Sequence, residues 1–146
     1  MSGEEDHELE IIGMTVKEAI DAGESQSIEY KREINDASDI AKEVVALSNN
    51  GGGTVFVGVN DDGTVAGIER PKEAGERIAG VLQDIQSPPN YDILELEVQD
   101  ESIISIIVPN YPHFPLAYDY KFYQRRGTTK QKLTPPEVWE LMPDRN

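Results

Sequence analysis

The chain has 146 residues, enough for one domain with a hydrophobic core that needs no cross-links. Its composition is 38% hydrophobic and 28% charged, as in ordinary globular proteins, and the absence of cysteine excludes disulfides, thiolate zinc sites and thiol nucleophiles. The formal net charge is −15, whereas nucleic-acid-binding domains are normally basic. Such an acidic, hydrated surface is expected in a protein adapted to high salt, or in one that never contacts nucleic acid.

The ends of the chain differ in character from its centre. Residues 1–13 are predicted to form an acidic, partly disordered lead-in, before one domain over residues 14–142 and a tail over residues 143–146. The apolar runs are strand-sized and too short to cross a bilayer. The N-terminus is acidic where a secretory or organellar signal would be basic. We therefore expect a cytoplasmic protein without a membrane partner.

The domain is predicted to begin with a short helix. Thr15 and Glu18 have the spacing of a capping box, and Gly23 can end the helix. Residues 27–31 alternate polar and apolar side chains, as does a strand with two distinct faces. An apolar stripe at helical spacing predicts a helix over residues 38–48, which the following Asn-Asn-Gly-Gly-Gly run stops.

The central part of the chain reads as a strand, a turn and a helix. Residues 54–59 are β-branched and aromatic, which predicts a buried strand. The Asp-Asp-Gly sequence that follows favours a hairpin turn, with a returning strand over residues 64–68. A second helix is predicted over residues 72–86, where a Ser-Pro-Pro sequence breaks it.

The remaining elements are mostly strands. Two strands are predicted over residues 93–98 and 103–108, followed by a proline-rich loop over residues 109–115. A further strand is predicted over residues 120–125, and a terminal helix with proline in its first turn over residues 135–141. Together the elements indicate a single α/β (α+β) domain, in which helices pack on a mixed β-sheet.

Positive charge is concentrated between residues 120 and 136, a segment that contains neither Asp nor Glu. In a chain this acidic, such a segment is a candidate surface for binding nucleic acid. The other interpretation is a solvated positive edge strand that discourages aggregation. The basic residues of the segment are Lys121, Arg125, Arg126, Lys130 and Lys132.

High salt would weaken the attraction between these residues and a phosphate chain. At about 1 M salt the screening length is only about 3 Å. A salt-adapted binder would then rely on direct hydrogen bonds, metal bridges or base stacking on Tyr118, Tyr120 and Tyr123. The alternative role of these tyrosines is ordinary strand packing.

Carboxylates are placed near the ends of the first two predicted strands. Glu24 precedes the first strand, Glu29 lies on it, and Asp61 follows the second. If the two strands pair, Glu29 and Asp61 meet at one end of the sheet, and converging acids usually bind a hard divalent cation. Lys31 shares a strand face with Glu29, so it could neutralise Glu29 or contact a phosphate. With 28 acidic residues in the chain, solvated carboxylates are the competing interpretation.

Familiar nucleotide and esterase motifs are absent. The chain contains no G-x-x-x-x-G-K-[ST], no G-x-G-x-x-G and no G-x-S-x-G sequence. The run Gly51-Gly52-Gly53 is therefore predicted to end a helix and to let the backbone pass close under the next strand.

Five blocks of sequence, in the same order, resemble the Schlafen-type AlbA domain family. The first is Glu24-Ser25-Gln26-Ser27-Ile28-Glu29-Tyr30-Lys31, where the family has E-S-x-x-x-E-F-K. The second is Ala46-Leu47-Ser48-Asn49 with Gly51-Gly52-Gly53-Thr54, and the third Gly58-Val59-Asn60-Asp61-Asp62-Gly63 with Val65-Ala66-Gly67-Ile68. The last two are Phe122-Tyr123-Gln124-Arg125-Arg126-Gly127-Thr128-Thr129 and Leu133-Thr134-Pro135-Pro136-Glu137-Val138.

The resemblance implies a mixed α/β fold and nucleic-acid binding, with RNA favoured over DNA. The animal Schlafen branch consists of metal-dependent endoribonucleases that act on structured RNA such as tRNA. Its two glutamates and one aspartate fall on Glu24, Glu29 and Asp61, which would then be catalytic and would bind Mg²⁺ or Mn²⁺. Lys31 and the basic segment would hold the nucleic-acid backbone.

The chain also departs from the family pattern. Asn60 stands where the family often has Asp, and Tyr30 replaces the usual Phe. The animal nucleases join two such lobes into a saddle, which a homodimer of this chain could rebuild. Two alternatives to a ribonuclease therefore stay open. One is a non-catalytic DNA- or RNA-binding or transcription-regulatory module, and the other a protein-interaction domain whose nucleic-acid surface has decayed.

Overall fold

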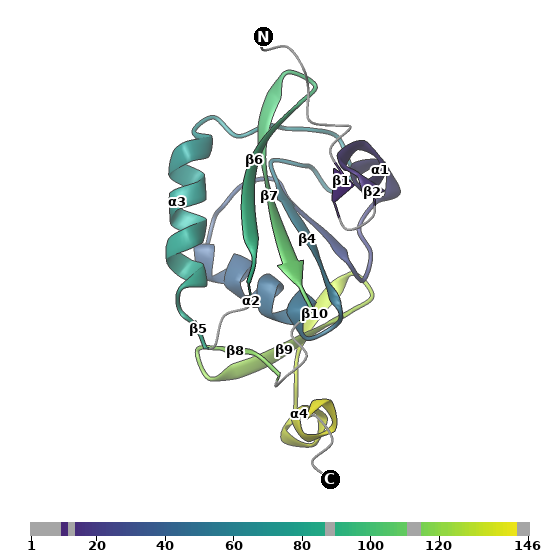
Figure 1. The fold of residues 1–146 in the computed structure, drawn as a ribbon, viewed down its shortest axis with the longest axis vertical. Helices are drawn as coiled ribbons and strands as arrows, with labels where there is room; N and C mark the ends of the chain where they lie inside the picture. Colours follow the sequence, from purple (N-terminus) through teal and green to yellow (C-terminus); the bar gives the residue numbers. More distant parts are fainter. Residues whose placement is uncertain (1–9, 12–13, 87–89, 111–114, 143–146) are drawn as a thin grey trace.

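The structure is a computed structural model that describes residues 10–11, 14–86, 90–110 and 115–142. Its centre is a four-stranded sheet with the strand order β3-β4-β7-β6 (Figure 1). These strands are β3 (Ile28–Lys31), β4 (Gly52–Val57), β6 (Asp92–Val98) and β7 (Glu101–Pro109). Since β3 and β4 are parallel and the other two pairs are antiparallel, the sheet is mixed, as predicted.

A second four-stranded sheet has the order β10-β9-β8-β5 and is antiparallel throughout. Its strands are β5 (Ile85–Gln86), β8 (Ala117–Tyr118), β9 (Lys121–Arg126) and β10 (Thr129–Lys132). A third, two-stranded sheet pairs β1 (Glu10–Ile11) with β2 (Met14–Thr15).

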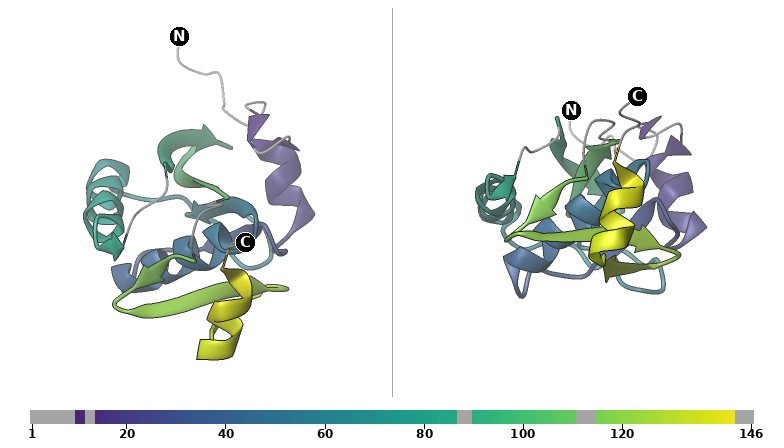
Figure 2. Two further views of the ribbon diagram at one scale, coloured as in Figure 1. Left: turned by 60° about the horizontal axis from the view of Figure 1, so that its bottom comes forward. Right: turned by 90° about the horizontal axis from the view of Figure 1, so that it is seen from below.

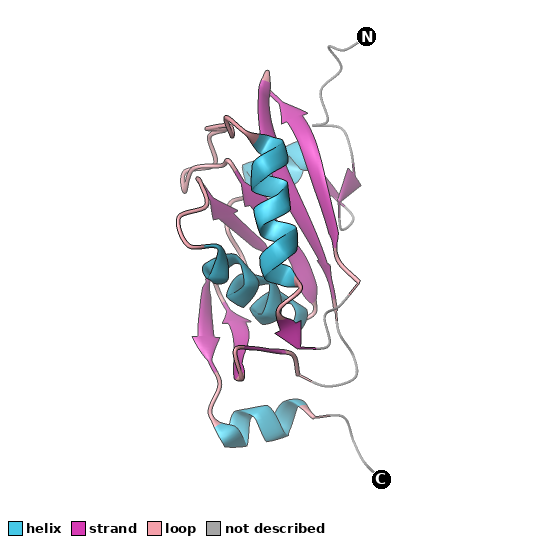
Figure 3. Ribbon diagram, turned by 90° about the vertical axis from the view of Figure 1, so that its left-hand side faces the viewer, coloured by secondary structure: helices cyan, strands magenta, loops and turns pink. Residues whose placement is uncertain are grey.

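The helices are α1 (Val16–Ala22), α2 (Ala37–Ser48), α3 (Pro71–Leu82) and α4 (Pro135–Leu141). α2 and α3 pack on one face of the central sheet, where β4 contributes Val55 and Val57 to the main core. α1 packs on the other face, with Phe56 of β4 in a second core. Figure 3 shows α3 lying along the central sheet and α4 apart from it, beyond the second sheet.

α2 lies between the two sheets (Figure 2), and its position explains why one helix is almost wholly buried. Residues 40–41 and 43–48 of α2 are all buried. The side that faces the central sheet is apolar, with Ile40, Val44 and Leu47 in the main core. Glu43 is also buried, and only 3% of its surface is exposed.

Local sequence signals account for the start of α1 and for the close approach of β4 to β7. The N–H of Glu18 donates to the Thr15 hydroxyl at 3.1 Å, and the N–H of Thr15 donates to the Glu18 carboxylate at 2.9 Å, which confirms the capping box. At Gly52, φ is 92°, and a Cβ atom would lie 2.6 Å from the Val108 carbonyl oxygen. Only glycine fits there.

Several predicted elements differ from the observed ones. The second predicted helix ends at Leu82 rather than at residue 86, because the chain continues into β5. The returning strand predicted over residues 64–68 is reduced to one isolated bridge between Val59 and Val65. β8 and β10 were not predicted, because one has two residues and the other is entirely polar. The lead-in over residues 1–9, the tail over residues 143–146 and residues 111–114 of the predicted loop lie outside the described residues.

Within the described part of the chain, no helix is both long and apolar enough to cross a membrane.

Candidate functional site

The three carboxylates predicted from the sequence line one depression of about 400 Å³ beside the ends of β3 and β4. Parallel pairing of these strands brings Asp61, which follows β4, to the same side of the molecule as the end of β3. Lys31, Arg32 and Thr128 also line the depression. We call it the acidic depression.

Glu24 is fixed by the edge of the central sheet. β3 is an edge strand, and the N–H of Tyr30 donates to Oε2 of Glu24 at 3.0 Å. The Tyr30 hydroxyl donates to the carbonyl of Ile20 in α1, so this tyrosine ties β3 to α1. Glu24 also lies close enough to Glu29 to help raise the pKa of Glu29.

Glu29 forms a buried ion pair with Arg125 of β9. The Arg125 Nη1 lies 2.6 Å from Oε1 of Glu29 and 3.3 Å from Oε1 of Glu43. The remaining donors of the guanidinium bond the carbonyls of Ser25 and Ile28 at 2.8–3.1 Å. The Arg125 side chain has no exposed surface. The prediction that Arg125 contacts a phosphate is therefore corrected: this arginine joins the second sheet to β3 and α2.

Lys31 and Lys130 complete the cluster on its outer side. The Lys31 Nζ lies 3.5 Å from Glu29 and 3.3 Å from Glu43, and it also pairs with Asp39. The Lys130 Nζ lies 2.7 Å from Asp39 and 3.2 Å from Glu43. The six members, which we call the ion cluster, are Glu29, Lys31, Asp39, Glu43, Arg125 and Lys130.

The environment shifts the pKa values within the ion cluster in opposite directions. Burial raises the pKa of Glu29 and of Glu43, although the neighbouring cations oppose the rise. Burial also acts on Asp39, but hydrogen bonds from Lys130 and Lys31 outweigh it and lower the Asp39 pKa. The pKa values of both lysines are raised, because the carboxylates outweigh burial. The lysines therefore stay charged at neutral pH, and they stabilise the fold as cations.

The rest of the basic segment is only partly available to a ligand. Arg126 pairs with Glu137 of α4 at 2.7 Å, and Lys121 lies 3.6 Å from Asp119. Lys132 is exposed and forms no ion pair with another described residue. The segment from residue 120 to residue 136 contains no acid, but acidic residues outside it neutralise most of its positive charges in the folded protein.

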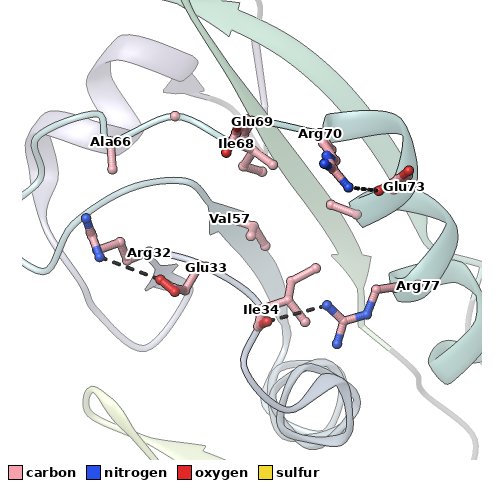
Figure 4. Close-up of a pocket in the computed structure, with 12 residues that line it drawn as sticks. Arg32, Glu33, Ile34, Val57, Ala66, Ile68, Glu69, Arg70, Glu73 and Arg77 are labelled. Atoms are coloured by element: carbon pink, nitrogen blue, oxygen red, sulfur yellow. Dashed lines mark hydrogen bonds and ion pairs between the residues drawn. The ribbon is translucent and has the colours of Figure 1, made fainter.

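A second cavity of about 540 Å³ shares Arg32 and Glu33 with the acidic depression (Figure 4). Arg70 and Arg77 also line it, and Figure 4 shows Arg70 directed toward Glu73 and Arg77 toward the Ile34 carbonyl. These contacts measure 3.6 and 3.5 Å. Three glutamates line the cavity with three arginines, so it carries no net charge to attract an anion.

The acidic depression does not have the geometry of a ready metal site. Among the described residues, no three His, Asp or Glu side chains are grouped so that they could hold one metal ion. Both oxygens of Glu29 already face cations, Arg125 at 2.6 Å and Lys31 at 3.5 Å. Asp61 is exposed at the rim. Glu24, Glu29 and Asp61 therefore share a depression without forming a three-carboxylate site.

Sequence reasoning missed three residues that organise this region: Asp39, Glu43 and Asn49. A signal for Glu43 was available, because it falls within the apolar stripe of the predicted helix, three residues after Ile40. Asn49 ends α2, and its side-chain nitrogen donates to the carbonyls of Leu116 at 3.0 Å and Tyr123 at 2.8 Å. Its Oδ1 accepts from the N–H of Leu116 at 2.7 Å.

The arrangement of these blocks can be compared with known proteins. The family described as "Schlafen, AlbA_2" matches residues 24–134, from Glu24 through both sheets to the residue before α4. The chain belongs to this family. The matched range includes Glu24, Glu29 and Lys31, which the structure brings to the acidic depression and the ion cluster. A search of curated proteins found no match.

Two solved structures show the same fold. One is the DIP2311 protein from Corynebacterium diphtheriae, 21% identical, with a TM-score of 0.60 over 79% of this chain and 26% of that chain. The other is the N-terminal domain of a putative ATP-dependent DNA helicase RecG-related protein from Nitrosomonas europaea, 19% identical, with a TM-score of 0.53 over 80% of this chain and 92% of that one. This chain thus corresponds to about a quarter of the Corynebacterium protein (26%).

Proposed function

We propose that this AlbA_2 domain binds nucleic acid, with RNA preferred, across the surface that includes the acidic depression. The main support for this proposal is that residues from three of the family's sequence blocks line the acidic depression together. Glu24, Asp61 and Thr128 are far apart in the sequence and line the same depression, together with the cations Lys31 and Arg32. The fold shared with the N-terminal domain of a RecG-related helicase supports the same class of ligand.

The charge distribution limits how such a domain can bind. The net charge of −15 repels a phosphate chain at long range, and the ion cluster uses most of the cations near the depression. Few phosphates can then be neutralised directly, so the salt dependence of binding is expected to be shallow. Shape and direct hydrogen bonds would govern binding to structured RNA, since A-form helices hide their major-groove edges.

Fluorescence anisotropy with labelled tRNA and a DNA duplex of similar length tests this proposal. Arg32→Ala is expected to weaken binding evenly across sequences and to reduce the salt slope by about one. Lys17→Ala, an exposed charge change on α1, is the matched control and should leave binding unchanged. If neither nucleic acid binds the wild-type domain at any salt concentration, the proposal is wrong.

A second candidate function is metal-dependent RNA cleavage. It is favoured by the presence of all three family acids in the depression, with Lys31 3.5 Å from Glu29. It is opposed by the engagement of Glu29 with Arg125. A cation would have to be held by fewer carboxylates, or Glu29 would have to leave its partners.

The cleavage test compares labelled tRNA incubated with Mn²⁺, with Mg²⁺ or with a chelator. Asp61→Asn is the informative variant, because Asp61 is exposed and the change should leave the fold intact. Asp84→Asn, which changes another exposed aspartate in the turn after α3, serves as the control. Cleavage that needs the metal and is lost only in Asp61→Asn would support the nuclease. Cleavage that survives both the chelator and Asp61→Asn would come from a contaminant.

A further inference from the structure

A groove of about 410 Å³ lies between the second sheet and α4. Its lining includes Tyr120, Phe122, Val138 and Trp139 along its apolar part, with Lys121 and Lys132 beside them. No carboxylate is among the described residues that line it. In a chain of net charge −15, a positively charged apolar groove is a local exception. α4 forms one wall of the groove, and none of its residues is buried. Figure 1 shows that this helix lies beyond the second sheet.

Two large hydrophobic side chains are strongly exposed in the described part of the chain, and both line this groove. Tyr120 is 84% exposed and Trp139 is 64% exposed. The other two tyrosines of this region differ, because Tyr123 is packed in the main core and Tyr118 is half-buried. Exposed aromatic side chains that lie together in one groove indicate a contact surface, whereas single exposed residues scattered over a protein do not.

The backbone at Tyr120 adds to this conclusion. Asp119 and Tyr120 form the two-residue turn between β8 and β9, with φ values of 53° and 59°. Such turns favour Asn-Gly, and a bulky residue with positive φ is strained. A strained tyrosine that gains no burial in return is typical of a residue kept for function.

The chemistry of the groove indicates its occupant. Aromatic faces stack on unpaired bases, while adjacent lysines contact the phosphates between them. A second copy of this chain would bring a net charge of −15 without bases to stack, and an apolar peptide would leave both lysines unpaired. The ion pair of Lys121 with Asp119 is exposed and 3.6 Å long, so it is weak and leaves the lysine available.

We propose that the groove binds a single-stranded segment of RNA, whose bases stack on Tyr120 and Trp139 and whose phosphates contact Lys121 and Lys132. This inference rests on the proposed function and specifies its substrate. The groove lies at the start of β9, and Thr128 in the acidic depression follows its end. Six residues of strand span about 20 Å, so one RNA molecule can reach both places. The domain thus selects RNA with an unpaired stretch beside a folded part.

Trp139 is the only tryptophan in the chain, so its fluorescence reports directly on this groove. The titration uses 12-nucleotide oligoadenylate, 12-nucleotide oligouridylate and a blunt 12-base-pair RNA duplex. Single strands should quench Trp139, and oligoadenylate should bind more tightly because adenine stacks better. The duplex should not quench it.

Variants separate stacking from structure. Tyr120→Gly should weaken single-strand binding at least about fivefold. The same change should keep or raise the Tm, because glycine relieves the positive φ, and a purely structural tyrosine would not show this combination. Lys132→Ala should also weaken binding, whereas Lys72→Ala, which removes the same charge from an exposed position on α3, should not.

Three results would overturn the inference in distinguishable ways. If labelled tRNA binds, but single strands do not quench Trp139 and Tyr120→Gly binds RNA as tightly as the wild type, the groove is not the single-strand site. The proposed function then stands. If no form of RNA binds, the proposed function itself fails. If Trp139 fluorescence changes with protein concentration alone, and sedimentation shows a dimer, a second copy covers the groove.

Discussion

Two adjacent arginines show that the role of a charged residue depends on where the fold places it. Arg125 lies in the acid-free basic segment, yet it is 1% exposed and pairs with two buried carboxylates. Its neighbour Arg126 is 41% exposed in its side chain and pairs at the surface with Glu137. The two residues are adjacent and chemically identical, and only one of them is part of the core.

Arg125→Ala is expected to destabilise the domain by about 3–5 kcal/mol, because it leaves Glu29 buried without its main counter-charge and takes one of three cations from Glu43. Arg126→Ala should cost less than about 1 kcal/mol, as for other exposed pairs. Urea unfolding followed by circular dichroism measures both. Equal effects of the two substitutions would contradict the structural role of Arg125.

Glu43 gives a pH-dependent prediction. Its pKa in the folded protein is raised above 4.5, so the folded state holds this proton more tightly than the unfolded chain. Ionisation of Glu43 therefore lowers the free energy of unfolding as the pH rises above 4.5, and this penalty is absent at lower pH. Glu43→Gln, which resembles the protonated form, should be as stable as the wild type near pH 4 and at least as stable at pH 7. A variant that is clearly weaker at pH 7 would show that the pairs with Lys31 and Lys130 outweigh burial.

At the scale of elements, one residue at the end of α2 adds hydrogen bonds to the ion pairs that join this helix to the second sheet. Asn49 makes three hydrogen bonds to Leu116 and Tyr123, on either side of β8. The side chain of the next residue, Asn50, instead donates to the exposed side chain of Gln26, at 3.1 Å. Asn49 and Asn50 are thus adjacent and chemically identical, but only the side chain of Asn49 bonds the backbone around β8 and β9.

Asn49→Ala should lower the free energy of unfolding by about 1–3 kcal/mol, because it leaves partly buried backbone groups unpaired. The amides of β8 and β9 should then exchange hydrogen faster than those of β4 and β7. Asn50→Ala is the control and should leave both the stability and the exchange rates nearly unchanged. Loss of protection spread evenly over both sheets would argue against a local anchor.

The elements that the sequence predicted are those with strong local signals. The stripe Ile40, Val44 and Leu47 predicted α2, and the capping box of Thr15 predicted α1. Of the second sheet only β9 was predicted, because β5 and β8 have two residues each, β10 is entirely polar, and β5 pairs with the distant β8. The convergence of Glu24, Glu29 and Asp61 followed from the pairing of β3 with β4, whereas the cations of the ion cluster come partly from β9 and β10. A linear pattern of acids cannot show which distant bases neutralise them.

At the scale of the whole molecule, the net charge of −15 is carried mainly by the surface, because the ion cluster contains three acids and three bases. Repulsion among surface carboxylates opposes the compact state, and salt screens it. The pairs that Arg125 forms with Glu29 and Glu43 are screened far less, because these side chains are almost completely buried.

The urea midpoint should therefore rise as NaCl increases from about 0.05 to 1 M, over which the screening length falls from more than 10 Å to about 3 Å. KCl should have the same effect, because screening does not depend on the identity of the cation. A midpoint that falls with salt would mean that attractive surface pairs, such as Arg126 with Glu137, dominate over repulsion.

The composition of the ion cluster has a consequence for the order in which the chain assembles. The members from β3 and α2 sum to −2, and the two members from the β9–β10 hairpin, Arg125 and Lys130, sum to +2. Before the hairpin docks, the rest of the fold holds an uncompensated pair of charges beside its core, and the hairpin exposes the opposite pair. Docking of the β9–β10 hairpin is therefore the step that neutralises the ion cluster. A separate peptide that carries this hairpin should bind a domain truncated before β9, because their charges are complementary.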